Sequence, residues 1–381
     1  MRVAEIETPA VLVDVARLDR NIARVQAHAD RQGVALHPHV KTHKCLEIAR
    51  RQLSAGAAGL TASKPAEAAV FLDAGAPMLT VAYPVLEAGQ VAALLATARR
   101  QRCHLRLIVD SPETVAAAQA AATGGAVECL LKVDVGLGRV GVSPGTPDVA
   151  TVADAVVAAP GLCLGGLLSH AGHAYGAEGP DGIRAIAQRE RRLLAGVRDQ
   201  LGETGLGSVT SVGCTPVALA EAQAGSSADG VTEIRPGNYV FLDLTALRLG
   251  IASLDEIALF VLSRVISVGP NHAIIDAGSK TLSSDGGPHG SGTLQGYGHA
   301  FRLDEGGGLP GDRDGSAAAS WTVERLSEEH GFVRLDGRPL AVGDRLVIVP
   351  NHACPVVNLT DRLTAVADGA VRDRWQVDAR T

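Results

Sequence analysis

Eight short apolar runs alternate with longer alanine-rich stretches through the first 245 residues, and this rhythm constrains the fold more than any other feature. The runs occupy 33–41, 58–63, 78–84, 104–110, 127–135, 161–170, 208–213 and 231–237. Runs of this kind are typical of strands that are buried on both faces, although the eighth is poorer in apolar residues. Between them, segments such as 111–122 open with Ser-Pro-Glu, which favours a helix start.

Eight strands that alternate with helices over roughly 240 residues predict an α/β fold, a parallel (β/α)8 barrel of the TIM type. A doubly wound open sheet is the alternative, but it is disfavoured because no GxGxxG motif follows the first run. After residue 245 the segments are strand-like, with little helical pattern, which predicts a smaller all-β domain. We therefore expect a barrel over 1–245 and a β domain over 246–381, with one long loop or insertion over 283–319.

The composition of the 381 residues favours a cytoplasmic protein. The formal net charge of −6 provides neither a basic surface for nucleic acid nor a polybasic arm for a membrane. The first ten residues lack the features of a secretion signal, and no apolar stretch approaches the roughly 18 residues of a membrane span. The six cysteines are scattered without a CxxC pair, which favours reduced thiols. We expect no nucleic-acid partner and no membrane partner.

Polar residues gather at the carboxyl ends of the predicted barrel strands, where barrels of this kind carry their active sites. These residues are His39, Lys41, His43, Lys64, Asp110, Asp134, Arg139, His170, His173, Gly213, Cys214, Thr215, Arg235, Gly237, Asn238 and Tyr239. The set is more polar than packing alone requires. The sequence therefore predicts an active site at this end of the barrel.

Each of these residues also has an ordinary structural explanation. Lys41 could be a solvated lysine, but its place at the end of an apolar strand favours a neutral, nucleophilic amine. His170 could be a hydrogen-bonded core histidine, and Arg139 a surface charge. The glycines and the hydroxyl of Thr215 that follow the last two strands could form tight turns, although barrels commonly bind phosphate there.

A His-x-Cys pair, His352 and Cys354, follows a strand-like run in the predicted β domain. On a strand, residues two apart project on the same face, so both side chains could reach one ion. Imidazole and thiolate suit Zn²⁺, and two protein ligands would leave positions for water or substrate. A pair this short also arises by chance, so packing is the alternative explanation.

Seven segments between Thr8 and Trp375 together resemble the D-serine dehydratase and D-threonine aldolase family of pyridoxal-phosphate enzymes, which have the alanine-racemase-like fold (fold type III). In order they are TPAVLVD, HPHVKTHKC, DVGLGRVGV, LLSHAGHAY, SVGCTP, VTEIRPGNYVFLD and PNHACPVVNL. The resemblance implies a (β/α)8 barrel followed by a β domain, a homodimer with its active site near the subunit interface, and a small-molecule D-amino acid as substrate.

The resemblance also implies roles for individual residues. Lys41 would be the Schiff-base lysine and His170 would pack against the pyridine ring, so these two are the predicted catalytic residues. Arg139 would lie near the phenolic oxygen of the cofactor, and Arg235 would face the pyridine nitrogen. The cofactor phosphate would be held by Gly213, Thr215, Gly237 and Asn238, with Tyr239 completing the cofactor-binding set. His352 and Cys354 would bind a divalent metal, with Zn²⁺ favoured over Mn²⁺ or Mg²⁺.

Two departures from the family pattern bear on the reaction. Relatives often carry Ser where this chain has Cys214, which leaves only backbone N–H donors to the phosphate at that position. Aldolases of the family typically carry Asp where this chain has Cys354, and this favours a dehydratase. We therefore expect a lyase that eliminates water from D-3-hydroxy amino acids to give a 2-oxo acid and ammonia. Retro-aldol cleavage to glycine and an aldehyde is the alternative; a racemase or a non-catalytic carrier of the cofactor is less favoured.

Overall fold

Two units make up the computed structural model, which describes the whole chain except residues 124, 203, 227, 291, 293, 305, 313–319 and 381. The first, here called the β unit, comprises Met1–Ile22, Thr42–Cys45 and Asn238–Arg380. The second, here called the barrel unit, comprises Ala23–Lys41 and Leu46–Gly237. Each unit has its own sheet and is described by itself.

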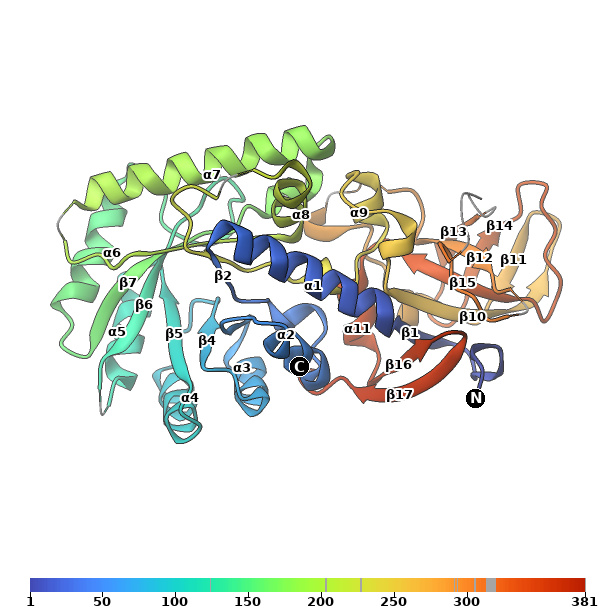
Figure 1. Ribbon diagram of the computed structural model, residues 1–381, viewed down its shortest axis with the longest axis horizontal. Helices are drawn as coiled ribbons and strands as arrows, with labels where there is room; N and C mark the ends of the chain where they lie inside the picture. The colour runs from blue at the N-terminus through green and yellow to red at the C-terminus, as the bar shows by residue number, and fades with distance from the viewer. Residues whose placement is uncertain are drawn as a thin grey trace. The chain divides into compact units, whose positions relative to one another are not determined.

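The barrel unit is built on eight parallel strands in the order β2-β9-β8-β7-β6-β5-β4-β3 (Figure 1). Their bounds are β2 Ala35–Leu36, β3 Leu60–Ala62, β4 Met78–Val81, β5 His104–Val109, β6 Val127–Lys132, β7 Leu162–Leu168, β8 Val209–Val212 and β9 Glu233–Ile234. A parallel bridge between His39 and Thr61 joins the two ends of this order, so the sheet curls round on itself. All eight strands lie within the apolar runs of the sequence, which confirms the predicted TIM-like fold class.

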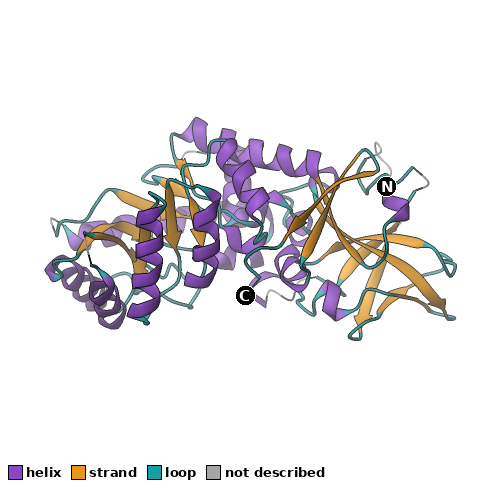
Figure 2. Cartoon of the chain, turned by 90° about the horizontal axis from the view of Figure 1, so that it is seen from below, coloured by secondary structure: helices purple, strands orange, loops and turns teal. Residues whose placement is uncertain are grey.

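Helices follow the barrel strands and cover the outside of the sheet (Figure 2). They are α2 Leu46–Ser54, α3 Pro65–Phe71, α4 Ala88–Arg100, α5 Pro112–Ala121, α6 Pro147–Ala158, α7 Gly179–Leu201 and α8 Thr215–Ala224, and α1 Val15–Gln32 precedes them. Ser111 caps α5, because its side chain accepts a hydrogen bond from the backbone N–H of Thr114. Ile108, Leu130 and Leu168 form one buried apolar cluster on neighbouring strands.

The β unit contains a nine-stranded sheet in the order β11-β14-β13-β12-β15-β10-β1-β16-β17. Its strands are β1 Ala10–Asp14, β10 Leu259–Val268, β11 His272–Ile275, β12 Gly298–Arg302, β13 Trp321–Leu326, β14 Gly331–Arg334, β15 Arg345–Pro350, β16 Arg362–Ala367 and β17 Ala370–Gln376. An additional antiparallel pairing of β10 with β11 curls part of this sheet into a barrel-like form. Three short helices accompany it: α9 Leu244–Arg248, α10 Ser279–Leu282 and α11 Ala353–Leu359.

The β unit differs from the expectations drawn from the sequence in two respects. Residues 1–22, assigned to the barrel by the expected boundary at 245, group with the β unit, because β1 pairs with both β10 and β16. The stretch 283–319 is not one loop: β12 lies inside it and pairs with β13 and β15. Residues 291, 293, 305 and 313–319 of that stretch lie outside the described residues.

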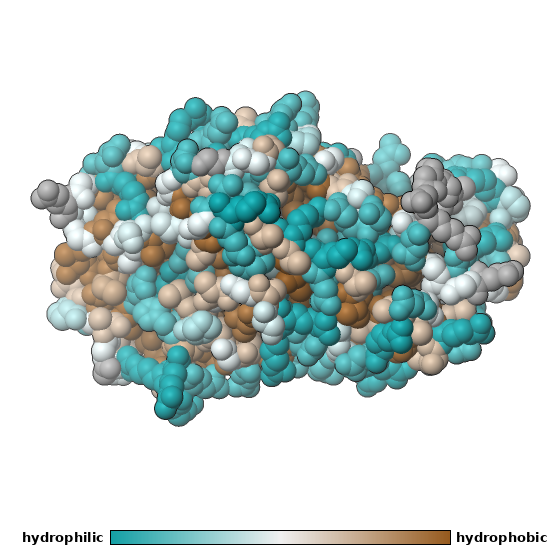
Figure 3. Space-filling view, in the orientation of Figure 1, coloured by the Kyte–Doolittle hydropathy of each residue, from teal (hydrophilic) through white to brown (hydrophobic). Residues whose placement is uncertain are grey.

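Apolar side chains of both sheets, such as Leu12 and Leu60, are fully buried. On the face seen in Figure 3, hydrophilic residues are interspersed with the apolar ones. Within the described part of the chain, no helix has the length and apolar character needed to cross a membrane.

Candidate cofactor and metal sites

Basic side chains gather at the carboxyl ends of the barrel strands, as the sequence predicts. Lys41 lies in the short turn Val40–Thr42 after β2, and Arg235 follows β9 directly. Burial lowers the pKa of His39 and of His170 well below the ordinary value, and in each case the nearby charge of Lys41 lowers it further. The charges of Arg235 and Arg139 also lower the pKa of His39. Both imidazoles are therefore neutral beside an excess of positive charge, an environment that suits an anionic ligand.

The ring of His170 is held by the backbone. Its Nδ1 lies 2.6 Å from the carbonyl oxygen of Gly213, and since a carbonyl only accepts, Nδ1–H donates. In the neutral ring the proton is thus on Nδ1 and not on Nε2. A Cβ at Gly213 would lie 2.6 Å from the backbone nitrogen of Arg235, so only glycine fits between the ends of β8 and β9.

Arg235 is buried, and polar groups of two neighbouring strand ends hold its guanidinium. One terminal nitrogen donates to Ser211 Oγ at 2.5 Å, and the other donates to the carbonyl oxygen of Ser169. Burial lowers the pKa of Arg235 to about 10, so the group stays charged at neutral pH.

Lys132, at the end of β6, is a candidate that the sequence reasoning missed. It is 4% exposed, and its Nζ donates to the carbonyl oxygen of Val133 at 3.0 Å. Burial lowers its pKa to about 7, and the charge of Arg235 acts in the same direction. Its only signal in the sequence is a lysine inside an apolar run that otherwise predicts a buried strand.

Helix α8 begins at Thr215, where β8 has just ended. The preceding residue, Cys214, stands at the N-cap without a capping hydrogen bond from its side chain, and burial raises the pKa of its thiol, so the thiol is neutral. A helix that starts at a strand end presents backbone N–H groups, an arrangement that suits phosphate. Thr215 and Gly237, from the predicted phosphate set, are buried residues of the barrel unit.

Asn238 and Tyr239, also predicted to contact the cofactor, belong to the β unit and are buried in a short turn. Asn238 Nδ2 donates to Asp243 Oδ2 at 2.7 Å. Its Oδ1 has no hydrogen-bond partner among the residues that the structure describes. A phosphate oxygen accepts and does not donate, so a contact of Asn238 with the predicted phosphate would use the backbone N–H and not this amide oxygen.

The acidic residues after the barrel strands have a structural role. Asp134 Oδ1 accepts the backbone N–H groups of Gly136 and Leu137, each at 3.0 Å, and so shapes the glycine-rich loop that carries the exposed Arg139. Asp110 Oδ2 accepts the N–H of Gly141 at 3.1 Å, at the far end of the same loop. These residues position Arg139 and need no other role.

His352 and Cys354 lie at the start of α11, not on the strand that the sequence predicted. His352 stands at the N-cap with an extended backbone (φ −144°, ψ 114°), and Cys354 is in the first turn. The two side chains are nevertheless close enough for their charges to act on each other. The extended conformation of His352 explains why strand geometry predicted their proximity although the segment is helical.

The charges of this pair are coupled. Burial opposes protonation of His352, but the Cys354 thiolate and a hydrogen bond with Asp285 outweigh it and raise the pKa of His352 to about 10. Burial would likewise raise the pKa of Cys354, but the charge of His352 outweighs it and lowers this pKa. Asp285 Oδ2 lies 2.8 Å from His352 Nδ1, and Thr42 Oγ1 lies 3.4 Å from Cys354 Sγ.

This set of donors fits a divalent metal of the zinc type. Thiolate and imidazole are ligands that Zn²⁺ prefers, and a carboxylate on the other nitrogen of a ligating histidine is a common supporting contact. Within the described ranges, His, Cys, Asp and Glu side chains form no group of three or more that could hold a metal. The structure thus brings together the two predicted ligands and adds Asp285, which the sequence reasoning missed.

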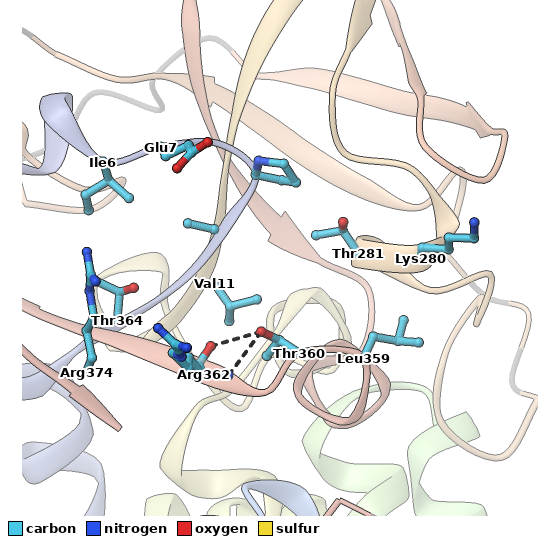
Figure 4. A pocket seen from close by; sticks show the side chains of 12 residues that line it. Ile6, Glu7, Val11, Lys280, Thr281, Leu359, Thr360, Arg362, Thr364 and Arg374 are labelled. Atoms are coloured by element: carbon cyan, nitrogen blue, oxygen red, sulfur yellow. Dashed lines mark hydrogen bonds between the residues drawn. The ribbon is translucent and has the colours of Figure 1, made fainter. Parts of the chain in front are cut away.

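A separate cavity of about 250 Å³ lies in the β unit and contains none of the predicted site residues (Figure 4). Glu7 and Pro9 line it from the segment before β1, and Arg362 and Arg374 line it from β16 and β17. Both arginines are exposed to solvent.

A (β/α)8 barrel with a cationic rim, in a chain that also carries a β domain, defines the alanine-racemase-like class of pyridoxal-phosphate enzymes. Residues 13–245 match the family model described as alanine racemase, N-terminal domain, and residues 258–366 match that of a putative serine dehydratase domain. The chain therefore belongs to the D-serine dehydratase and D-threonine aldolase family of that class, as the sequence predicted.

Three relatives illustrate the similarity. The D-threo-3-hydroxyaspartate dehydratase of Delftia sp. (strain HT23) is 38% identical, over 97% of this chain and 97% of its own length. The D-threonine aldolase of Arthrobacter sp. is 33% identical, over 99% of this chain and 93% of its own. A solved structure of a cysteine-to-alanine mutant of D-threo-3-hydroxyaspartate dehydratase, in the metal-free form, superposes with a TM-score of 0.83 at 36% identity and covers 99% of this chain and 98% of its own.

Proposed function

We propose that this protein is a pyridoxal-phosphate- and metal-dependent lyase that removes water from D-3-hydroxy amino acids and releases a 2-oxo acid and ammonia. The observation that carries the proposal is the pair His352 and Cys354, whose charges act on each other, with Asp285 Oδ2 2.8 Å from His352 Nδ1. Loss of hydroxide from the β-carbon is helped by a Lewis acid, and this pair is suited to bind one. The similarity to a dehydratase over 97% of the chain supports the same assignment.

The barrel unit would hold the cofactor. Lys41 would carry it, His170 would pack against its ring, and the N–H groups at the start of α8 would bind its phosphate. Asn238, through its backbone N–H, and Tyr239 would complete the cofactor-binding set, as the family resemblance implies. When bound, pyridoxal phosphate withdraws electron density from the α-carbon of an amino acid. The amine of Lys41, in its neutral form, would take the proton from that α-carbon.

Two arginines would set the charge around the cofactor. Arg139, on the loop shaped by Asp134, would lie near its phenolic oxygen, and Arg235 would face its ring nitrogen. Because Arg235 keeps its own proton at neutral pH, it would donate to that nitrogen and would not accept from it. The ring nitrogen would then stay unprotonated, which makes assistance at the β-hydroxyl more useful.

The metal would be held by His352 and Cys354, with Asp285 orienting the imidazole. A divalent ion there would supply Lewis acidity to the leaving hydroxyl. We propose Zn²⁺, because the ligand set is one thiolate and one imidazole. A cytoplasmic location and a homodimeric state are further proposals, which rest on the composition of the chain and on its family.

Retro-aldol cleavage is the second candidate. It is supported by the 33% identity to a D-threonine aldolase over 99% of the chain. The same side chains would serve, since cleavage between Cα and Cβ also needs the cofactor and a metal near the β-hydroxyl. Cys354 favours elimination, because aldolases of the family typically carry aspartate there.

Product analysis tests the proposal and separates the two reactions. Purified protein is supplied with pyridoxal phosphate and Zn²⁺ or Mn²⁺, and then with D-serine, D-threonine or D-threo-3-hydroxyaspartate. We expect a 2-oxo acid and ammonia. An amino acid together with an aldehyde would establish the aldolase instead, and the absence of both product pairs from all three substrates would reject the lyase.

A further inference from the structure

We propose that Glu190 and Glu233 are positioning residues that act through Arg235, by fixing its guanidinium in one orientation and keeping it charged. The inference rests on the proposed function in one respect, which is the contact between Arg235 and the cofactor. Both glutamates are buried in the barrel unit, and the resemblance to the family assigns no role to either.

The first connection runs through Ser211. Arg235 donates to Ser211 Oγ at 2.5 Å, so the hydroxyl proton of Ser211 can point toward Glu233, and Ser211 lowers the pKa of the Glu233 carboxyl. Glu233 is itself fixed, because Arg106 donates to its two oxygens at 2.6 and 2.8 Å. Bidentate pairing of this kind leaves the carboxylate little freedom to rotate. The Ser211 hydroxyl therefore has one preferred direction. The Arg106–Glu233 pair fixes the Ser211 oxygen that accepts from Arg235.

The second connection runs through Ser169. The carbonyl oxygen of Ser169 accepts from the other terminal nitrogen of Arg235, while Ser169 Oγ lies 2.5 Å from Glu190 Oε1. Glu190 comes from α7, so this bond ties the end of β7 to a helix on the outside of the barrel. Ser169 is fully buried. Two terminal nitrogens of one guanidinium are thus each held by a serine, and each serine is supported by a glutamate.

The charges agree with this arrangement. Burial and the positive charge of Arg106 act against the charged form of Arg235, while Glu233 and Glu190 favour it. Burial raises the pKa of Glu190, and the hydrogen bond from Ser169 and the charges of Arg235 and Lys132 act against this rise and favour its carboxylate. A guanidinium so deeply buried needs nearby carboxylates to offset the loss of solvation, and these two are the acids that act on it most strongly.

The experiment compares Glu190→Gln and Ser211→Ala with the wild-type holoenzyme. Both changes keep the volume nearly constant, and each interrupts one connection. We expect the affinity for pyridoxal phosphate to fall about tenfold in each variant, as is typical for losing support of a charged hydrogen bond, and the visible absorbance spectrum of the bound cofactor to change. The same two changes in an Arg235→Gln background should have no further effect on that spectrum, because they act through Arg235.

Glu221→Gln is the matched control. Glu221 is also buried in the barrel unit, 5% exposed, and is also paired with an arginine, Arg191, but it does not contact Ser169 or Ser211. It should leave affinity and spectrum unchanged. The inference is overturned if Glu190→Gln and Ser211→Ala both behave like wild type, or if their effects persist in the Arg235→Gln background. If the wild-type protein binds the cofactor and turns over substrate, and both variants behave like it, only this inference is rejected. Wild-type protein that fails to bind the cofactor would reject the proposed function as well.

Discussion

Replacing Arg106 by leucine should be among the most damaging single changes in the barrel unit. Arg106 is 1% exposed and holds Glu233, which is 6% exposed, through two hydrogen bonds at 2.6 and 2.8 Å. The change removes the partner and leaves a buried carboxylate unpaired. Breaking a buried pair in this way costs about 3–5 kcal/mol of unfolding free energy. In a unit of this size that corresponds to a fall in Tm of roughly 10 °C.

The effect should depend on pH with a definite sign. Burial acts to raise the pKa of Glu233, but the hydrogen bonds and charge of Arg106 outweigh it and hold the pKa below the ordinary value of 4.5. A depressed pKa means that the pair stabilises the fold above the unfolded-state pKa, and that this contribution is lost as the pH falls through the folded-state pKa. Without Arg106, Glu233 can be neutralised by a proton. The difference between wild type and Arg106→Leu should therefore be largest at pH 7–8 and should shrink toward about pH 4.5.

Thermal unfolding followed by circular dichroism at several pH values measures this difference. Arg51→Leu is the control, because Arg51 pairs with Glu47 on the exposed side of a helix, and such pairs contribute about 0.5 kcal/mol or less. Replacing Arg106 and Glu233 together by leucine should cost less than replacing Arg106 alone. A loss below about 1 kcal/mol, a loss that does not change with pH, or a double variant as unstable as the single one would refute the reasoning.

Three further predictions concern the sites. Lys41→Ala should abolish lyase activity and the absorbance of the lysine-bound cofactor, whereas Lys44→Ala, three residues along the same segment, should keep both; activity in Lys41→Ala would reject the role of Lys41. Cys354→Ala should reduce bound metal, measured by elemental analysis, and turnover by at least tenfold while cofactor absorbance is kept; full metal content would remove Cys354 from the ligand set. Gly213→Ala places a Cβ 2.6 Å from the Arg235 nitrogen, so cofactor affinity, measured by titration, should fall about tenfold or more, and an unchanged affinity would show that β8 and β9 can separate freely.

The barrel could be predicted from sequence because each of its strands is a short apolar run followed by a helix pattern, and this local signal survives folding. The boundary expected at residue 245, in contrast, left β1 with the barrel. Its sequence, Ala-Val-Leu-Val-Asp, is as apolar as the barrel strands, and only its pairing with β10 and β16 assigns it to the other sheet. Pairing between segments roughly 250 and 350 residues apart leaves no local trace.

The candidate site was predicted unevenly for a similar reason. Arg235 follows a strand directly, and Lys41 and His170 come shortly after one, so strand ends indicate them. Glu190 could not be found in this way, because it lies in the middle of a long helix whose sequence is that of an ordinary amphipathic helix. Asp285 lies 67 residues before His352, and only the fold brings the two together.

The predicted cofactor site is surrounded by positive charge and the predicted metal site by negative charge. This difference bears on whether each ligand can be removed without the other. In the barrel unit, burial first and then the charges of Lys41 and Arg139 keep His39 and His170 neutral, so the basic side chains around them suit an anion. In the β unit, the Cys354 thiolate and Asp285 outweigh the single positive charge of His352, which suits a cation. Asp243 accepts from both Asn238 and the backbone N–H of Ala353, but no side chain belongs to both ligand sets, so we expect cofactor and metal each to bind without the other. Chelation should then stop turnover without releasing the cofactor, and removal of the cofactor should leave the metal content unchanged, whereas loss of both together would mean that one site depends on the other.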